Sequence, residues 1–257
     1  MTDIKIPDNF MGVPIDGAMQ KVLEKQKNQS QSKASEPARM AVNANINPDE
    51  YVIIPQENKV IAYNQGFNNL DYNGTHLELA KNGLFMPTPR TFTAHLTNVI
   101  KAHEGGTVLY YASGKLMYAK EANDLYRKLM RNCWSWLNAR FSEIILGKGF
   151  KYIELETITG VNKRELITKR EPLEQCLAEK RYANMEFNKH GLAVSASISQ
   201  NYQQGKNIYF YPPKADCVAR FNARLGGVYL CCDGSPDLLY SSLGTFACAD
   251  AQGAKTK

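Results

Sequence analysis

Glu154 and Glu156 are two residues apart in a segment, residues 150–156, that the sequence predicts to be a strand. Alternate residues of a strand point to the same face, so carboxylates at this spacing are able to hold a metal ion, as in restriction-like nucleases. Such a site also requires an upstream Asp and a Lys close by on the same strand, and neither falls at the required spacing. We therefore interpret the pair as acidic positions on an exposed strand and predict no metal site.

The histidines and cysteines also lack the spacing of a catalytic or metal site. No His-x-x-x-His pattern is present, and we assign the histidines to surface or helix-face positions: His76, His95, His103 and His190. No Cys-x-x-Cys pattern occurs among the six cysteines: Cys133, Cys176, Cys217, Cys231, Cys232 and Cys248. This scatter favours reduced thiols, although Cys217 and Cys248 are able to meet across adjacent strands. We expect no catalytic residue and no cofactor.

Length and composition are those of an ordinary globular protein. A chain of 257 residues with 44% hydrophobic residues can bury a substantial core. The net charge is +6, but lysine and arginine are spread along the chain, often beside acidic residues, so we expect no nucleic-acid partner. No long apolar run is present, so we expect no signal peptide and no membrane insertion. We expect a cytoplasmic or virion-associated protein, and the sequence leaves its oligomeric state open.

The first 106 residues are predicted to form two parts. Residues 1–48 are polar and poor in aromatic side chains, a composition typical of a flexible arm, although residues 18–25 contain enough helix formers for a short helix. Residues 49–106 predict a small α+β extension. It begins with a hairpin of two β-branched runs, residues 51–54 and 59–63.

Two helices are predicted in the rest of this extension. Thr75 caps the first helix, Glu78 completes a capping box three residues later, and Gly83 ends the helix. Thr88 and Pro89 open the second helix. Its apolar residues fall on one face: Phe92, Leu96, Val99 and Ile100.

A second domain is predicted from residue 107 to residue 250. It opens with a hairpin, residues 107–111 and 115–118, and continues into the strongest helical pattern of the chain, residues 119–141. On such a helix Trp134 and Trp136 diverge by about 200°. We expect Trp134 to extend the buried stripe and Trp136 to pack against a loop or against the preceding subdomain.

The middle of this domain is a long polar excursion from residue 159 to residue 206. It predicts irregular chain with one short helix over residues 172–178. An alternating strand over residues 207–211 follows. Residues 251–257, at the end of the chain, are predicted to be a disordered tail.

A hairpin organises the C-terminal region. Alternation over residues 218–223 places Ala219, Phe221 and Ala223 on one side, as a strand with one buried face requires. A glycine turn and a second apolar run, residues 228–232, complete the hairpin. A Ser-Pro break at 235–236 and a last run over 243–248, expected to close the sheet, follow it.

The residues of this region carry a resemblance. The order Arg-Phe, Ala, Tyr-Leu, Cys-Asp, Ser-Pro, Ser-Ser-Leu-Gly and Phe-Ala resembles the C-terminal half of a C-type lectin fold of the formylglycine-generating-enzyme-like branch. It is most similar to the variable proteins that retroelements diversify in phages, bacteria and archaea. The resemblance implies an α+β fold, a C-type-lectin-like domain with an N-terminal extension.

In that family, scaffold residues alternate with positions that mutagenic reverse transcription randomises. The resemblance implies a scaffold of Ala219, Arg220, Phe221, Ala223, Leu230, Cys232, Pro236, Leu243, Gly244 and Phe246. It implies ligand-binding display positions at Asn222, Arg224, Leu225, Gly226, Gly227, Tyr229, Cys231, Asp233, Gly234, Asp237, Leu238, Leu239 and Tyr240. Calcium-dependent glycan binding is not expected, because the motifs Glu-Pro-Asn and Trp-Asn-Asp are missing.

The function implied is recognition of a protein or cell-surface ligand by a hypervariable surface, without catalysis. Tyr and Arg supply contact area and hydrogen bonds at low ordering cost, as in an antibody paratope. One alternative is an enzyme, either a formylglycine-generating-like oxidase or a small metal-dependent nuclease. A second alternative is a virion or assembly component that docks through its N-terminal arm.

Overall fold

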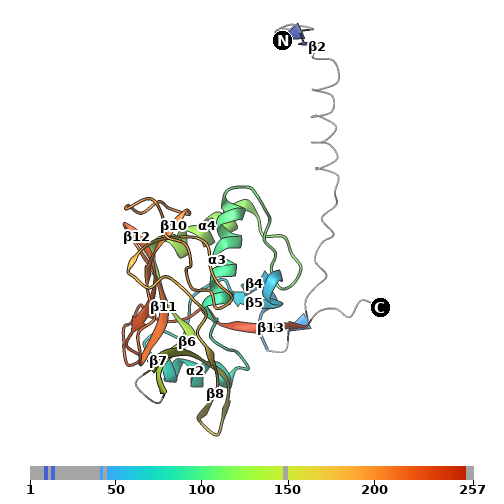
Figure 1. Cartoon of the computed structure of the whole chain (residues 1–257). Helices are drawn as coiled ribbons and strands as arrows, with labels where there is room; N and C mark the ends of the chain where they lie inside the picture. Colours follow the sequence, from blue (N-terminus) through green and yellow to red (C-terminus); the bar gives the residue numbers. More distant parts are fainter. Residues whose placement is uncertain (1–8, 11–12, 15–40, 43–44, 147–149, 253–257) are drawn as a thin grey trace. The chain divides into compact units, whose positions relative to one another are not determined.

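The computed structural model describes residues 9–10, 13–14, 41–42, 45–146 and 150–252 (Figure 1). Strands β1 (Asn9–Phe10) and β2 (Val13–Pro14) pair antiparallel with each other. From Ala38 onward the described residues form one compact unit. The helix predicted for residues 18–25, most of the predicted arm and the last residues of the predicted tail lie outside the described residues.

Most strands of this unit belong to one seven-stranded sheet. Its order is β8-β7-β6-β11-β12-β10-β9, and every pair is antiparallel except β10 with β12. The strands are β6 (Cys133–Leu146), β7 (Phe150–Asn162), β8 (Glu165–Pro172), β9 (Arg181–Asn184), β10 (Asn207–Tyr211), β11 (Cys217–Arg224) and β12 (Gly227–Gly234). The predicted C-terminal hairpin and the predicted strands at 150–156 and 207–211 are confirmed.

A four-stranded sheet joins segments from both ends of the unit, in the order β3-β13-β5-β4. The strands are β3 (Ala41–Val42), β4 (Tyr51–Ile54), β5 (Lys59–Ala62) and β13 (Cys248–Gln252). The hairpin predicted at 51–63 is confirmed. The predicted closing strand at 243–248 is wrong, because regular pairing begins only at Cys248 and joins β5 and β3 instead of the larger sheet. Residues 41–42 and 251–252, assigned to the arm and the tail, are therefore strand residues.

The described residues contain three α-helices, α2 (Tyr72–Lys81), α3 (Pro89–His103) and α4 (Ala119–Arg131). Thr88 caps α3 as predicted, since its hydroxyl accepts from Thr91 N at 3.2 Å. The start predicted for α2 is wrong: Asp71 is the cap, accepting from Gly74 N, and Thr75 lies inside the first turn. Helices and sheets together make an α+β fold, the predicted class.

The helix predicted for residues 119–141 ends ten residues early. Helix α4 stops at Arg131, and residues from Cys133 onward form strand β6. Leu129, Cys133, Leu137 and Phe141 are spaced by four, and residues four apart share a face in a strand as well as in a helix. Trp134 does not extend a buried stripe as expected, because it is half-buried. Trp136 packs against residues before residue 106, as expected, and is fully buried.

Two shorter predictions also differ from the structure. Residues 172–178 contain no helix, since β8 ends at Pro172 and irregular chain follows. The hairpin predicted at 107–118 is reduced to a turn with one isolated bridge between Tyr110 and Leu116. Two 3₁₀ helices, η1 (Pro48–Glu50) and η2 (Pro55–Glu57), flank β4.

Helices α3 and α4 cover one face of the seven-stranded sheet, which we call the inner face, and α3 also contacts β4 (Figure 1). The inner core combines residues from before and after residue 106, including Val52, Phe92 and Phe221. Residues 49–106 are thus not a separate extension. On the opposite, outer face, Trp136 packs against Tyr72 of α2, with ring centroids 5.9 Å apart.

Candidate functional site

The hairpin β11–β12 has two unlike faces. Its inner-face side chains are buried in the core: Ala219, Phe221, Ala223, Leu230 and Cys232. Between them, Arg220, Asn222 and Tyr229 point to the outer face and are half-buried. The alternation predicted for this strand is confirmed, and it continues past a register shift between Val218 and Arg220.

Strand pairing aligns five outer-face residues in one row across five strands. Tyr182 of β9 pairs with Tyr209 of β10, and Tyr209 pairs with Tyr229 of β12. Asn222 of β11 lies opposite both Tyr229 and Trp134 of β6. Residues opposite one another in a sheet share a face, so these five side chains form a continuous strip, which we call the outer row.

The aromatic members of the outer row contact one another and their neighbours. The rings of Tyr182 and Tyr209 are 4.9 Å apart in an edge-to-face arrangement, and Tyr209 lies 6.1 Å from Tyr229. The guanidinium of Arg224 lies over the Tyr229 ring at 5.3 Å, a cation–π contact. All five members are half-buried, which leaves part of each side chain accessible on the sheet surface.

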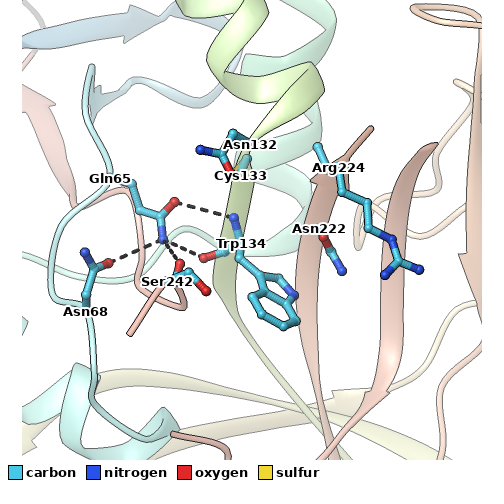
Figure 2. Close-up of a pocket in the computed structure, with 9 residues that line it drawn as sticks. Gln65, Asn68, Asn132, Cys133, Trp134, Asn222, Arg224 and Ser242 are labelled. Atoms are coloured by element: carbon cyan, nitrogen blue, oxygen red, sulfur yellow. Dashed lines mark hydrogen bonds between the residues drawn. The ribbon is translucent and has the colours of Figure 1, made fainter. Parts of the chain in front are cut away.

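A pocket of about 370 Å³ opens at the β6 end of the outer row (Figure 2). It is lined by Gln65, Asn68, Asn132, Cys133, Trp134, Asn222, Ala223, Arg224 and Ser242. Figure 2 shows Asn222 between Trp134 and Arg224. A second pocket of about 260 Å³, near α3, contains none of the predicted display residues. Of these two pockets, the larger is the one that the display segment helps to build.

Gln65 holds the rim of this pocket together. Its amide nitrogen donates to the carbonyl oxygens of Trp134 at 2.6 Å and Ser242 at 3.0 Å. Gly244 lies directly behind this contact, and a Cβ there would collide with Asn68 Oδ1 and the carbonyl oxygen of Gly66. The Gln65 amide thus contacts two residues that lie 69 and 177 positions further along the chain. The close packing beside it requires glycine at position 244.

Trp134 lines the pocket and also contacts the loop after Pro236. Its indole stacks on Tyr240 at 5.1 Å, with the ring planes 7° apart. The indole Nε1 is buried and has no hydrogen-bond acceptor among the described residues. Buried donors are nearly always paired, so this N–H has an unused capacity to bind an acceptor.

The display residues predicted from the resemblance fall into three groups. Exposed members are Arg224, Leu225, Gly226, Asp237, Leu239 and Tyr240. Half-buried members are Asn222, Tyr229, Asp233 and Leu238. Buried members are Gly227, Cys231 and Gly234. Only Asn222 and Arg224 line the larger pocket, while Asp233 pairs with Lys180 at 3.3 Å farther along the sheet.

The cysteines are all free thiols. The predicted meeting of Cys217 and Cys248 is wrong, because β11 and β13 belong to different sheets. Cys231 and Cys232 are adjacent in β12 and therefore point to opposite faces of the sheet, and both are buried. Burial raises the pKa of the Cys231 thiol to about 11, although the nearby Arg220 lowers it, so this thiol is neutral near pH 7.

The remaining residues considered for chemistry are placed by the fold and form no metal or catalytic cluster among the described residues. Glu156 is buried and accepts a hydrogen bond from Arg170 Nε at 2.7 Å. The expectation that the strand is exposed at this position is therefore wrong. His76 and His95 lie on helices α2 and α3, the helix-face placement expected for histidines, and both are buried. Among the described residues, no three His, Cys, Asp or Glu side chains gather as metal ligands. Within the same part of the chain, no helix has the length and apolar character needed to span a membrane.

Comparisons with known proteins assign this chain to no family. No protein-family model matches it. No curated protein and no solved structure matches it either.

Several residues of the site were not singled out from the sequence. Tyr182 and Tyr209 belong to the outer row, and Gln65, Asn68 and Ser242 belong to the pocket. The alternation in the strand at 207–211 was a usable signal for Tyr209 because it indicates which residues share a face. Gln65 lies in irregular chain, and no local pattern connects it with Trp134.

Proposed function

We propose that this chain is a non-catalytic ligand-binding protein, and that its recognition surface is the outer row together with the loop after Pro236. The observation that carries the proposal is the outer row itself, which joins the predicted positions Asn222 and Tyr229 to three aromatic residues on one sheet face. Beside it, Leu225, Leu239 and Tyr240 expose 93%, 60% and 44% of their surfaces. Tyr240 stacks on Trp134 of the row and Leu225 follows Arg224 in the turn, and exposed apolar surface adjoining such a row is typical of a protein-binding surface.

The side-chain types of this surface suit recognition of a protein or cell-surface ligand. Tyrosine, tryptophan and arginine dominate binding energy at protein interfaces because they combine large area with few rotatable bonds and polar ends. The row stands on paired strands, whose inner face is packed against α3 and α4. Such a rigid support lowers the entropy lost on binding.

We further propose that the chain is a C-type-lectin-like variable protein diversified by a retroelement. The resemblance in residues 218–248 supports this proposal, and so does the separation of its two sets of positions. The proposed scaffold residues Phe221, Leu230 and Phe246 are buried, whereas most of the display positions keep exposed surface. A position that is rewritten without loss of folding must lie outside the packed core.

The genomic DNA around the coding sequence tests the diversification. If the proposal holds, a near-copy of the stretch encoding residues 222–240 lies close by and differs from it only where the copy has adenines. The differences should fall on exposed positions such as Arg224, Leu225 and Tyr240. A locus without such a copy would contradict diversification, while a copy whose differences fall on Phe221 or Leu230 would contradict the proposed assignment of faces.

A display library tests ligand binding itself. Seven positions would be randomised together: Asn222, Arg224, Tyr229, Asp233, Asp237, Leu239 and Tyr240. We expect selection against an unrelated protein such as lysozyme to enrich binders from this library. A matched library on the outward positions of the β7–β8 hairpin, Lys169 and Ile167 among them, should yield none. Equal enrichment from both libraries would contradict the special role of the outer row.

A further inference from the structure

The lining of the larger pocket has an uneven charge. It contains one cation, the guanidinium of Arg224, together with side-chain amides, a hydroxyl and an indole, and it contains no carboxylate. The only thiol in the lining, Cys133, is neutral because burial raises its pKa. The pocket therefore offers a positive charge and hydrogen-bond donors, with nothing negative to oppose an anion.

Arg224 is available for a ligand. Among the described residues, no carboxylate lies within ion-pair distance of its guanidinium, whereas the exposed Arg90 and Arg170 pair with Glu57 and Glu156. Its contact with the Tyr229 ring restrains the side chain without using its hydrogen-bond donors. A planar guanidinium with free donors matches the two oxygens of a carboxylate.

Other donors of the pocket are also unused. Within the described part of the chain, the side chains of Asn132 and Asn222 form no hydrogen bond, and the buried Trp134 Nε1 has no acceptor. Gln65 differs, because its amide is fully engaged in holding the rim. The rim of the pocket is thus held in place by Gln65, while other donors in the lining have no partner within the described part of the protein. Such donors are better suited to binding a ligand than to stabilising the fold.

We propose that this pocket binds a carboxylate, supplied by an acidic side chain of the protein partner, with Arg224 as the charged anchor. This inference rests on the proposed function, and it names the chemical group that the surface recognises. Tyr182, Tyr209 and Tyr229 then supply contact area beside the anchor. A charged pair at the edge of an aromatic patch gives an interface its orientation as well as affinity.

The two tryptophans make the pocket observable by NMR. Only Trp134 and Trp136 contribute indole N–H signals, and Trp134→Phe assigns them. Trp136 is an internal control, because its Nε1 already donates to the Leu70 carbonyl oxygen at 3.2 Å. The full-length ¹⁵N-labelled protein would be titrated with N-acetyl-L-glutamate α-amide, whose only charge is the side-chain carboxylate, with the neutral N-acetyl-L-glutamine α-amide, and with inorganic phosphate.

We expect N-acetyl-L-glutamate α-amide to shift the Trp134 indole signal saturably, with a dissociation constant on the order of 1 mM for so small a probe. The Trp136 signal should not move. In Arg224→Gln the dissociation constant should rise by about tenfold or more, because a charge-assisted hydrogen bond is lost. Arg181→Gln, an exposed arginine on β9 whose strand position faces away from Tyr182, is the matched control and should bind as the wild type does.

Three outcomes would overturn the assignment. They are an equal response to the glutamine analogue, an unchanged affinity in Arg224→Gln, and tighter binding of phosphate than of the carboxylate. Each would leave the proposed recognition surface standing, since the display library tests that surface with the pocket randomised. Conversely, the display library could yield no binders while the wild-type protein binds the glutamate probe saturably. That result would reject the protein-recognition function and leave the carboxylate site supported.

Discussion

The inner and outer faces of the hairpin β11–β12 are built from alternate residues of the same two strands, yet they have opposite properties. Phe221, Leu230 and Cys232 on the inner face have no exposed surface. Asn222 and Tyr229, which lie between them in the sequence, remain partly exposed on the outer face. A period of two is therefore enough to separate the residues that stabilise the fold from those available to a ligand.

The two faces also differ in how their side chains are restrained. Phe221 contacts Phe92 of α3 with ring centroids 4.7 Å apart, so a second layer of structure fixes it. Tyr229 contacts only its neighbours on the sheet and the side chain of Arg224 among the aromatic and cation–π contacts described. Changes on the inner face must therefore disturb two layers, whereas changes on the outer face disturb one.

Truncation of Phe221 should give the largest difference between the faces. We expect Phe221→Ala to lower the free energy of unfolding by about 3–5 kcal/mol, because it leaves a cavity between β11 and α3. Tyr229→Ala, on the paired strand but the outer face, should cost about 1 kcal/mol or less, since it leaves no enclosed cavity. Urea unfolding followed by tryptophan fluorescence measures both, and equal losses would contradict the separation of the faces.

Gly244 tests the backbone behind the pocket. Gly244→Ala should lower the free energy of unfolding by about 1–3 kcal/mol, because the new methyl group collides with Asn68 Oδ1 and the Gly66 carbonyl oxygen. Gly66→Ala is a close control, since a Cβ at Gly66 meets no atom within 4 Å. We expect the control to change stability by about 0.5 kcal/mol or less. Similar losses for both variants in urea unfolding would show that the tight contact is not the cause.

His95, buried in helix α3 beside the inner core, should make stability depend on pH. Burial lowers the pKa of His95 to about 3 in the folded state, from 6.5 when it is exposed. Between these values the unfolded chain binds a proton that the folded chain does not, so stability falls as pH decreases from 6.5 towards 3. The expected slope from this one residue is about 1.4 kcal/mol per pH unit.

The slope of unfolding free energy against pH in His95→Gln measures this contribution. We expect a shallower slope than in the wild type between pH 6.5 and pH 4.5, whatever the variant does to absolute stability. His103→Gln, at the exposed end of the same helix, controls for the removal of a histidine. An unchanged slope in His95→Gln would mean that His95 gains a proton in the folded state and that this part of the interior admits charge.

Local patterns predicted the hairpin and its faces, because alternation and the glycine turn act over a few residues. The same local signals misled where two structures share them. The spacing of four from Leu129 to Phe141 suits a helix and a strand equally, and only the pairing of β6 with β7 and β11 selects the strand. Thr75 and Asp71 are both good caps, and the structure uses Asp71.

The pocket was beyond sequence analysis for a different reason. Its rim depends on contacts of Gln65 with residues 69 and 177 positions away, which no local pattern encodes. Asn222 and Arg224 were predicted as display positions through the resemblance, but the identity of the opposite wall was not. Tertiary packing brings these segments together, and a single sequence contains no direct record of such distant pairs.

Exchanges at the exposed display positions should give the smallest effects. Leu225→Ser and Leu239→Ser should each change the free energy of unfolding by about 0.5 kcal/mol or less, because neither side chain packs against the core. Gly227 is the informative exception within the same predicted set. A Cβ on Gly227 would lie 2.7 Å from the Tyr229 hydroxyl, so Gly227→Ala must swing that ring away from its position.

Because the displaced group is the end of a side chain and not backbone, we expect Gly227→Ala to be tolerated in urea unfolding, with a loss near that of Leu225→Ser. Its effect should appear instead in the NMR signals of the Tyr229 ring, which would lose their contacts with Arg224 and Tyr209. A large loss of stability would show that Gly227 belongs to the scaffold. The boundary between scaffold and display positions would then fall within the turn at Gly226 and Gly227, and Gly227 would not be free to vary.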